Sequence, residues 1–264
     1  MKNIFKFAEA FFDQEAIDQK LALTHQAYQA CIAGELTFIS NRPVMPIEQI
    51  TFPERPVLLA PRQMPRRKLT TAVGVAAFFH AIAHVEFVAI YLAWDILYRF
   101  RGMPEQFYQD WLKVADEEAQ HFELIRIHLR TMQVEYGDLP AHSGLWDHAR
   151  DTADDLPDRL ALVPRCMEAR GLDVTPALIE KFRLLGDEAS VAILTRILTD
   201  EIGHVALGSY WFKLVCQQRG FEAETKYQEL IEEYYVGGKP KGPFNRALRK
   251  TAGFSDAEID WLEG

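Results

Sequence analysis

The stretch VADEEAQHF at residues 114–122 decides the fold, because it contains a carboxylate and an imidazole at helical spacing, Glu118 and His121. Residues three apart lie on one face of a helix, about 5–6 Å from each other, so both side chains can reach one metal ion. The other residues on that face are apolar, which directs the pair toward the core. Some four-helix bundles bind two metal ions with two Glu-x-x-His pairs and one further Glu from each remaining helix.

A second copy of this spacing occurs at Glu201 and His204, in the sequence DEIGH. One such pair arises readily by chance, so the register of the two pairs, rather than the motif alone, indicates a common site. Glu86 precedes Glu118 by 32 residues, and Glu168 precedes Glu201 by 33. The two halves therefore look like duplicated helical hairpins, each of which contributes one Glu and one Glu-x-x-His pair.

Six side chains form the predicted site. They point at the core, where a buried carboxylate without a partner is costly, and a metal ion satisfies several of them at once. The alternative is a buried salt-bridge network without a metal, but these helix faces lack matching basic residues. Four carboxylates and two imidazoles suit iron or manganese. The predicted ligands are Glu86, Glu118, His121, Glu168, Glu201 and His204.

Helical periodicity runs through nearly every long segment and no alternating strand pattern stands out, so the expected fold class is all-α. We expect a four-helix core domain at residues 69–219, preceded by a helix and an irregular, proline-rich arm at 1–68 and followed by a helical extension at 220–264. Helices are predicted at residues 3–33, 69–100, 104–136, 157–169, 188–219, 222–235 and 255–263, with a connector at 137–157.

The third core helix is expected to break just past the predicted ligand Glu168. Gly171 has the place of a C-cap, and Pro176 has the place of the first residue of a new helix. Such a break would open a path from the surface to the metal ions.

The overall charge and the cysteines limit the classes of partner and location. The chain has 264 residues and a formal net charge of −9, so it has no general attraction for phosphate backbones and a nucleic-acid partner is not expected. The three cysteines match no zinc or redox motif, and residues 1–20 do not resemble a signal peptide. These observations favour a reduced, cytoplasmic location.

The most apolar stretch, residues 72–97, is long enough to span a bilayer. It contains Glu86 and Asp95, however, and charges inside a membrane are costly. A buried bundle helix is therefore expected rather than a membrane span. His80 and His84, on the same stretch, are interpreted as buried histidines with internal partners.

Beyond these spacings, about residues 60–218 resemble the ferritin-like di-iron carboxylate superfamily, and within it an uncharacterised bacterial family known as a domain of unknown function. The resemblance is specific for the metal site and implies a ferritin-like four-helix bundle with extra N- and C-terminal helices. The matching phrases are HVEFVAI, MPEQFYQDWLKVADEEAQHFELI, YGDLPAH, GLWDHA, LALVPRCMEARGLDVTP and DEIGHVALG.

The resemblance also implies roles for the matched residues. Each half of the site would serve one of two iron ions, with Glu118 and Glu201 as candidate bridges and Fe/Mn or Mn/Mn as alternative metal pairs. Asp200 and Glu117, each directly before a ligand Glu, would hydrogen-bond ligand histidines and so fix their tautomer.

The expected activity is that of an oxygen-dependent di-iron oxidase or hydroxylase acting on a small organic molecule with dioxygen. The large segments outside the core and the expected break past Glu168 motivate this hypothesis. A ferroxidase or iron-handling protein, a tRNA-modifying hydroxylase, and a binding module with structural metal ions are the alternatives. The substrate and the electron donor stay open, as does a homodimer.

Overall fold

The computed structural model describes residues 2–65 and 68–264. The described residues are mainly helical, and their only regular sheet is a parallel two-residue ladder between β1 (Lys2–Asn3) and β2 (Leu36–Thr37). The expected all-α class is therefore confirmed. The chain forms two compact units, Met1–Arg150 and Asp151–Gly264, which we call the N-terminal and the C-terminal unit. The expected three-part division stays a prediction.

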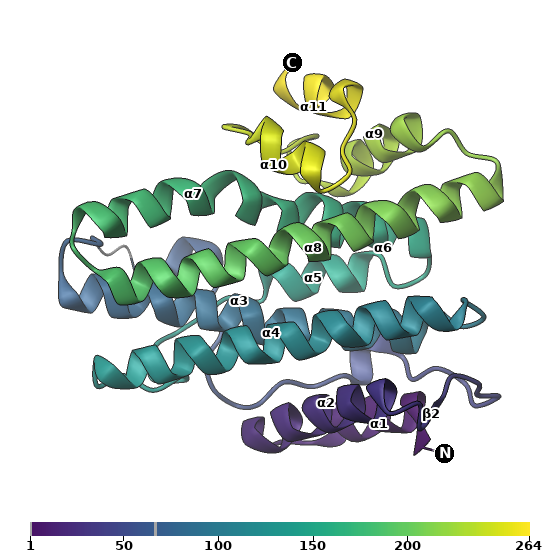
Figure 1. Cartoon of the computed structure of the whole chain (residues 1–264), viewed down its shortest axis with the longest axis horizontal. Helices are drawn as coiled ribbons and strands as arrows, with labels where there is room; N and C mark the ends of the chain where they lie inside the picture. The colour runs from purple at the N-terminus through teal and green to yellow at the C-terminus, as the bar shows by residue number, and fades with distance from the viewer. Residues whose placement is uncertain (1, 66–67) are drawn as a thin grey trace. The chain divides into compact units, whose positions relative to one another are not determined.

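An antiparallel hairpin of two long helices, α3 (Ala72–Arg99) and α4 (Glu105–Thr131), forms the centre of the N-terminal unit (Figure 1). Thr71 caps α3 by accepting a hydrogen bond from the backbone N–H of Gly74. The turn between the helices contains Gly102, whose φ of +77° is left-handed. The hairpin tip lies where the sequence predicts it, and α4 ends earlier than expected.

The helix expected over residues 3–33 is two helices, α1 (Ile4–Asp13) and α2 (Ile17–Ile32). Gln14 is extended, with φ −79° and ψ 130°, and ends α1. Because of this break α1 packs against α3 while α2 packs against α4. Phe11, for example, stacks on Trp94 with ring centroids 5.6 Å apart.

The irregular arm between β2 and α3 contains two short 3-10 turns, η1 (Ile47–Gln49) and η2 (Pro61–Gln63). It is tied to the segment after α4 by a parallel bridge between Leu58 and Ala141. The expected connector at 137–157 is wrong in part, because it contains the helix α5 (Gly144–Asp151). Its mixed polar composition obscured a short helix that is stabilised by packing rather than by propensity.

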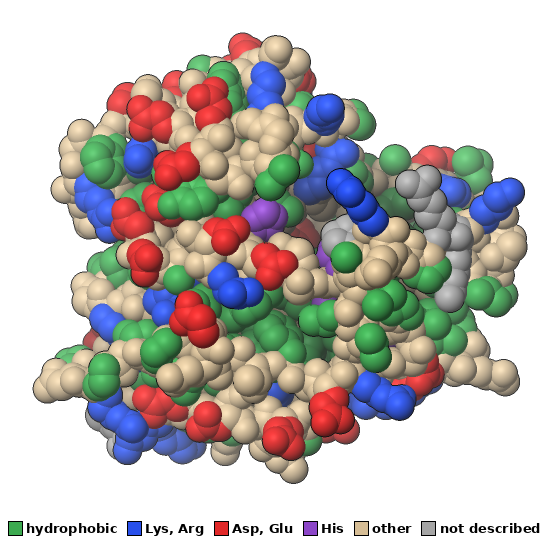
Figure 2. Space-filling view, turned by 180° about the vertical axis from the view of Figure 1, so that it is seen from behind, with side chains coloured by type: hydrophobic (Ala, Val, Ile, Leu, Met, Phe, Trp, Pro, Cys, Tyr) green, Lys and Arg blue, Asp and Glu red, His purple; other side chains and the backbone are tan. Residues whose placement is uncertain are grey.

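Among the described residues, α3 is the helix long and apolar enough to cross a membrane by length and composition, and 61% of its most apolar window is buried inside the protein. On the face of the molecule drawn in Figure 2, Lys and Arg side chains are intermixed with Asp and Glu side chains.

The C-terminal unit begins with a continuous helical segment formed by α6 (Leu156–Leu162), the π-helix η3 (Val163–Glu168) and α7 (Ala169–Leu184). The predicted break at residues 171–176 is wrong. Gly171 does not have a positive φ, and Pro176 lies inside α7. The irregularity occurs earlier, in the π-turns of η3.

The long helix α8 (Glu188–Arg219) lies beside α7 and matches its predicted range (Figure 1). Buried apolar residues of α7 pack on it, and this packing outweighs the local tendency of Gly and Pro to end a helix. The chain ends with α9 (Ala223–Tyr234), α10 (Arg246–Thr251) and α11 (Asp256–Glu263). Of these, only α10 was not expected.

Candidate metal centre

Three of the predicted ligands lie on the central hairpin of the N-terminal unit: Glu86 on α3, and Glu118 and His121 on α4. Their exposed fractions are 4%, 1% and 0%. Neighbours on the same helix faces, such as Ile90 and Phe122, are fully buried. The apolar faces that pack the hairpin therefore also turn these three polar side chains into its core.

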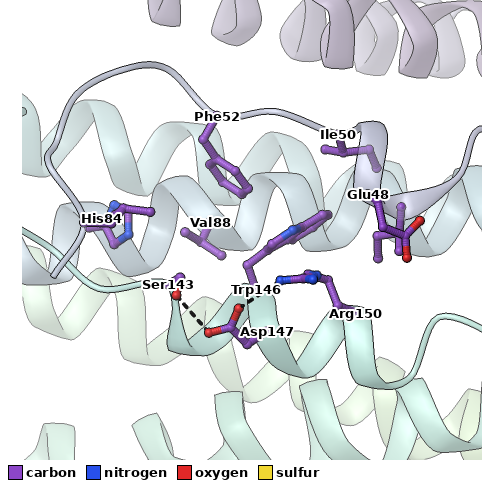
Figure 3. Close-up of a pocket in the computed structure, with 11 residues that line it drawn as sticks. Glu48, Ile50, Phe52, His84, Val88, Ser143, Trp146, Asp147 and Arg150 are labelled. Atoms are coloured by element: carbon purple, nitrogen blue, oxygen red, sulfur yellow. Dashed lines mark hydrogen bonds and ion pairs between the residues drawn. The ribbon is translucent and has the colours of Figure 1, made fainter. Parts of the chain in front are cut away.

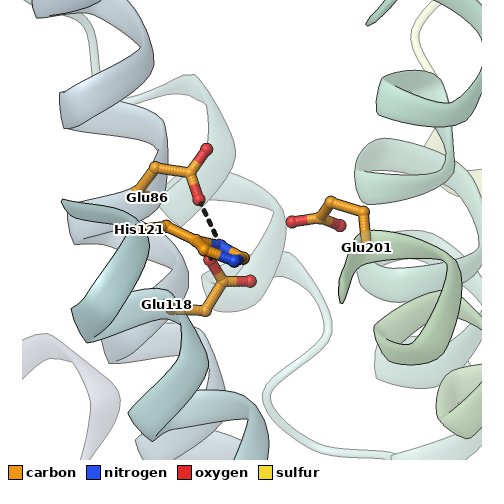
Figure 4. Close-up of side chains that lie close together, drawn as sticks. All are labelled: Glu86, Glu118, His121 and Glu201. Carbon is orange, nitrogen blue, oxygen red and sulfur yellow. Dashed lines mark hydrogen bonds and ion pairs between the residues drawn. The ribbon is translucent and has the colours of Figure 1, made fainter. Parts of the chain in front are cut away.

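The three side chains converge on one point. Nδ1 of His121 lies 3.2 Å from Oε2 of Glu86 and 3.2 Å from Oε2 of Glu118, and the three ligand atoms lie within 4.8 Å of one another. Figure 4 shows the carboxylates and the imidazole pointing toward each other from the two helices. The hairpin register inferred from the 32-residue spacing brings these residues together.

This cluster is electrostatically costly without a cation. Burial, and after it the neighbouring Glu118 carboxyl, hold the pKa of Glu86 well above its ordinary value, while His121 acts in the opposite direction. A divalent ion would stabilise both carboxylates in their charged form. Two carboxylates and one imidazole are donors that suit iron or manganese, so the residues present fit such an ion.

The C-terminal unit places the other predicted ligands on two elements. Glu201 and His204 lie one turn apart on α8, with Oε1 of Glu201 3.6 Å from Nδ1 of His204. Glu168 is the last residue of η3. Within the described residues of this unit, these three do not form a tight group like that of the N-terminal unit. In Figure 4 the Glu201 side chain extends from α8.

The two residues expected to support ligand histidines have charged neighbours on their own helices. Glu117 accepts a hydrogen bond from Nζ of Lys113 at 2.8 Å, and Asp200 accepts one from Nε of Arg196 at 2.5 Å. Both are pairs at i and i+4. The proposed contact of Glu117 and Asp200 with ligand histidines stays a prediction.

The histidines before Glu86 are buried and have internal partners. His84 contacts the Tyr136 hydroxyl through Nδ1 at 2.9 Å and the His142 carbonyl through Nε2 at 3.2 Å. Burial lowers the pKa of His84 to about 4. Nε2 of His80 accepts a hydrogen bond from the Gly137 N–H at 2.9 Å. These contacts agree with the interpretation of both as core histidines.

The fold and this site define an all-helical protein with a buried cluster of carboxylates and histidine that can bind a metal ion. The chain belongs to the family described as "Protein of unknown function (DUF455)", which matches residues 13–260. It is 46% identical over 227 residues to an uncharacterized protein of Haemophilus influenzae, covering 83% of this chain and 78% of that protein. No solved structure matches the chain.

Proposed function

We propose that the protein binds a pair of metal ions, iron or manganese, on six side chains. The observation that supports the proposal most is the buried cluster of Glu86, Glu118 and His121, with both carboxylates 3.2 Å from one imidazole nitrogen. Three ligands leave coordination positions open, so further donors are needed for a closed site. The full proposed set is Glu86, Glu118, His121, Glu168, Glu201 and His204.

The ligands in the C-terminal unit are proposed because the sequence repeats the Glu-x-x-His spacing there. Glu201 and His204 have the spacing of Glu118 and His121, and they lie on the second helix of the hairpin formed by α7 and α8. The four long helical segments, one hairpin in each unit, are the elements that a ferritin-like four-helix bundle requires. We therefore propose that fold and that superfamily for the chain.

For the reaction, we propose oxidation of a small organic substrate with dioxygen. A bound pair of reduced metal ions supplies oxygen activation, and the protein supplies orientation and exclusion of side reactions. Here the burial of Glu118 and His121 keeps bulk water away from the ligands. The helix break expected just past Glu168 does not support this function, because α7 is continuous. The remaining support comes from the segments outside the two hairpins, because a minimal four-helix unit does not require them.

The metal proposal is tested by anaerobic titration of the metal-free protein with ferrous iron, followed by metal analysis. We expect two ions per chain in the wild type, and fewer than one retained in Glu118→Ala and in His204→Ala. Glu105→Ala, which removes an exposed carboxylate from the same helix as Glu118, should retain both ions. Full metal content in Glu118→Ala would show that the ligand assignment is wrong.

The oxygen proposal is tested on the iron-loaded protein by oxygen uptake and by the change in near-ultraviolet absorbance after exposure to air. Both should be fast in the wild type and lost in Glu118→Ala. Size-exclusion chromatography of the aerated sample distinguishes the iron-handling alternative. A large, mineral-filled assembly would contradict an enzyme that acts on an organic substrate.

A further inference from the structure

A pocket of about 360 Å³ lies in the N-terminal unit, on the side of α3 that faces away from the proposed metal ligands. His84 and Val88 line it. Glu86 lies between them in sequence and points to the opposite side, because two helical residues are about 200° apart around the axis. The volume falls within the range of about 300–1,000 Å³ that is usual for small-molecule sites.

The pocket walls come from the two segments that the sequence presents as connectors. The irregular arm supplies Phe52 and Ile50 on one side, and α5 supplies Trp146 on the other (Figure 3). Phe52 stacks on Tyr91 of α3, with ring centroids 4.1 Å apart, and meets Trp146 edge-on at 5.3 Å. The aromatic surface is thus held in place before any ligand arrives.

The apolar part of the pocket continues along α3. A second hollow of about 180 Å³ shares His84 and Val88 with the first and is lined mainly by apolar side chains, among them Phe78, Ile82 and Leu145. His84 has both ring nitrogens engaged by Tyr136 and His142, so it adds no free polar group to this end. The shape and the lining suit an apolar body rather than a sugar or a nucleotide.

Charged side chains line the pocket on the side away from His84: Arg150 and Glu48 lie toward that end, and Asp147 lies between Ser143 and Arg150 (Figure 3). Asp147 accepts a hydrogen bond from the Ser143 hydroxyl at 2.8 Å and lies 3.7 Å from Nη1 of Arg150. Glu48 makes no ion pair within the described part of the chain and is exposed. Glu48, Asp147 and Arg150 thus give this part of the lining two carboxylates and one guanidinium, and Glu48 and Arg150 are exposed to solvent.

We propose that this pocket binds a small organic molecule with a protonated amine and a flat, apolar body. The excess carboxylate at the open end attracts one positive charge, and the ammonium stays partly hydrated there. The apolar body packs against the rings of Phe52 and Trp146, which also favour a nearby cation. This site is independent of the proposed metal centre, because no metal ligand lines it.

Isothermal titration calorimetry on the metal-free, full-length protein at pH 7 tests the proposal with three probes of matched size. They are 2-phenylethylamine, the neutral 2-phenylethanol and the anionic 3-phenylpropanoate. The amine should bind at least about threefold more tightly than the alcohol, as expected for a solvent-exposed charge pair. The anion should bind more weakly than the alcohol. Equal affinities across the series, or no amine binding at millimolar concentration, would overturn the proposal.

Four variants locate the binding site. Glu48→Gln and Asp147→Asn should each weaken amine binding about twofold to threefold. Glu54→Gln removes an exposed carboxylate from the same arm outside the pocket and should change nothing. Leu58→Trp places a large side chain at the half-exposed rim and should abolish binding of all probes. Amine binding that survives in Leu58→Trp would place the ligand elsewhere and contradict the proposal; thermal melts verify that each variant is folded.

Discussion

Lys20 of α2 shows how a single residue can oppose folding at neutral pH. Its side chain is fully buried, and its ammonium donates a hydrogen bond to the Phe11 carbonyl. Nζ also lies over the rings of Phe11 and Tyr91, 4.5 and 4.8 Å from their centroids. These contacts compensate only in part for the lost hydration, because burial lowers the pKa of Lys20 from 10.5 to about 8, while Asp13 acts in the opposite direction.

We predict that Lys20→Met changes the pH dependence of stability. Between pH 8 and 10.5 the unfolded state binds more protons at Lys20 than the folded state, so this residue makes stability rise with pH. From pH 7 to pH 9.5 the unfolding free energy of the wild type should rise relative to that of the variant by about 2 kcal/mol. Urea unfolding at both pH values measures this difference.

The control is Lys6→Met, which removes an exposed lysine from α1. Its stability difference from the wild type should stay constant between the two pH values. If the stability difference between Lys20→Met and the wild type is also the same at both pH values, the partners of the buried ammonium stabilise it as strongly as water does.

At the scale of elements, η3 is the segment that positions the predicted ligand Glu168. π-Helical turns are rare and occur frequently at functional sites. α8 approaches η3 closely at Gly208, where an added Cβ would come within 2.6 Å of Cβ of Pro164. η3 also contributes Arg165, whose guanidinium forms a fully buried ion pair with Glu258 of α11 at 2.6 Å.

We predict that Glu258→Leu destabilises the protein by about 3–5 kcal/mol, because it leaves the Arg165 guanidinium buried without its carboxylate. The double variant Arg165→Leu/Glu258→Leu should recover most of this loss, since an apolar pair has no charge to desolvate. Urea unfolding of the single and double variants completes the double-mutant cycle.

Glu258 also accepts the backbone N–H of Ser255 in the capping box of α11, so the cycle needs a control for the cap. Ser255→Ala removes the capping hydroxyl and leaves Arg165 paired. It should cost about 1 kcal/mol. If Glu258→Leu costs no more than this, the ion pair does not hold η3 in place.

At the scale of the whole molecule, the six proposed ligands are divided equally between the two units, three in each. A metal ion that binds only the folded protein stabilises it by an amount that depends on metal concentration and affinity. If ligands from both units hold the same ions, this stabilisation must reach both. Two separate sites would stabilise each unit independently.

Hydrogen exchange measured by mass spectrometry separates these two cases. We predict that manganous ion added to the metal-free protein slows exchange both in α4 and in α8. In Glu118→Ala the protection should disappear from α8 as well as from α4, although the substitution lies in the N-terminal unit. Protection of α8 that persists in Glu118→Ala would show that the units bind metal separately.

The parts of the fold that were predictable from the sequence depend on local periodicity. The central hairpin and the placement of Glu86 beside Glu118 follow from residue counts on two uninterrupted helices. The prediction over residues 3–33 missed the break at Gln14, which no Gly or Pro signals. The prediction at Gly171 and Pro176 relied on local signals that helix packing outweighs.

By itself, the sequence determined the all-helical class, the range of α8 and the convergence of Glu86, Glu118 and His121, because helix geometry converts spacing directly into position. Only the tertiary structure decided where η3 forms, which charges pair in the core, and that the arm and α5 enclose a pocket. Those features depend on contacts between residues far apart in the chain, such as Arg165 with Glu258, and no local pattern encodes such contacts.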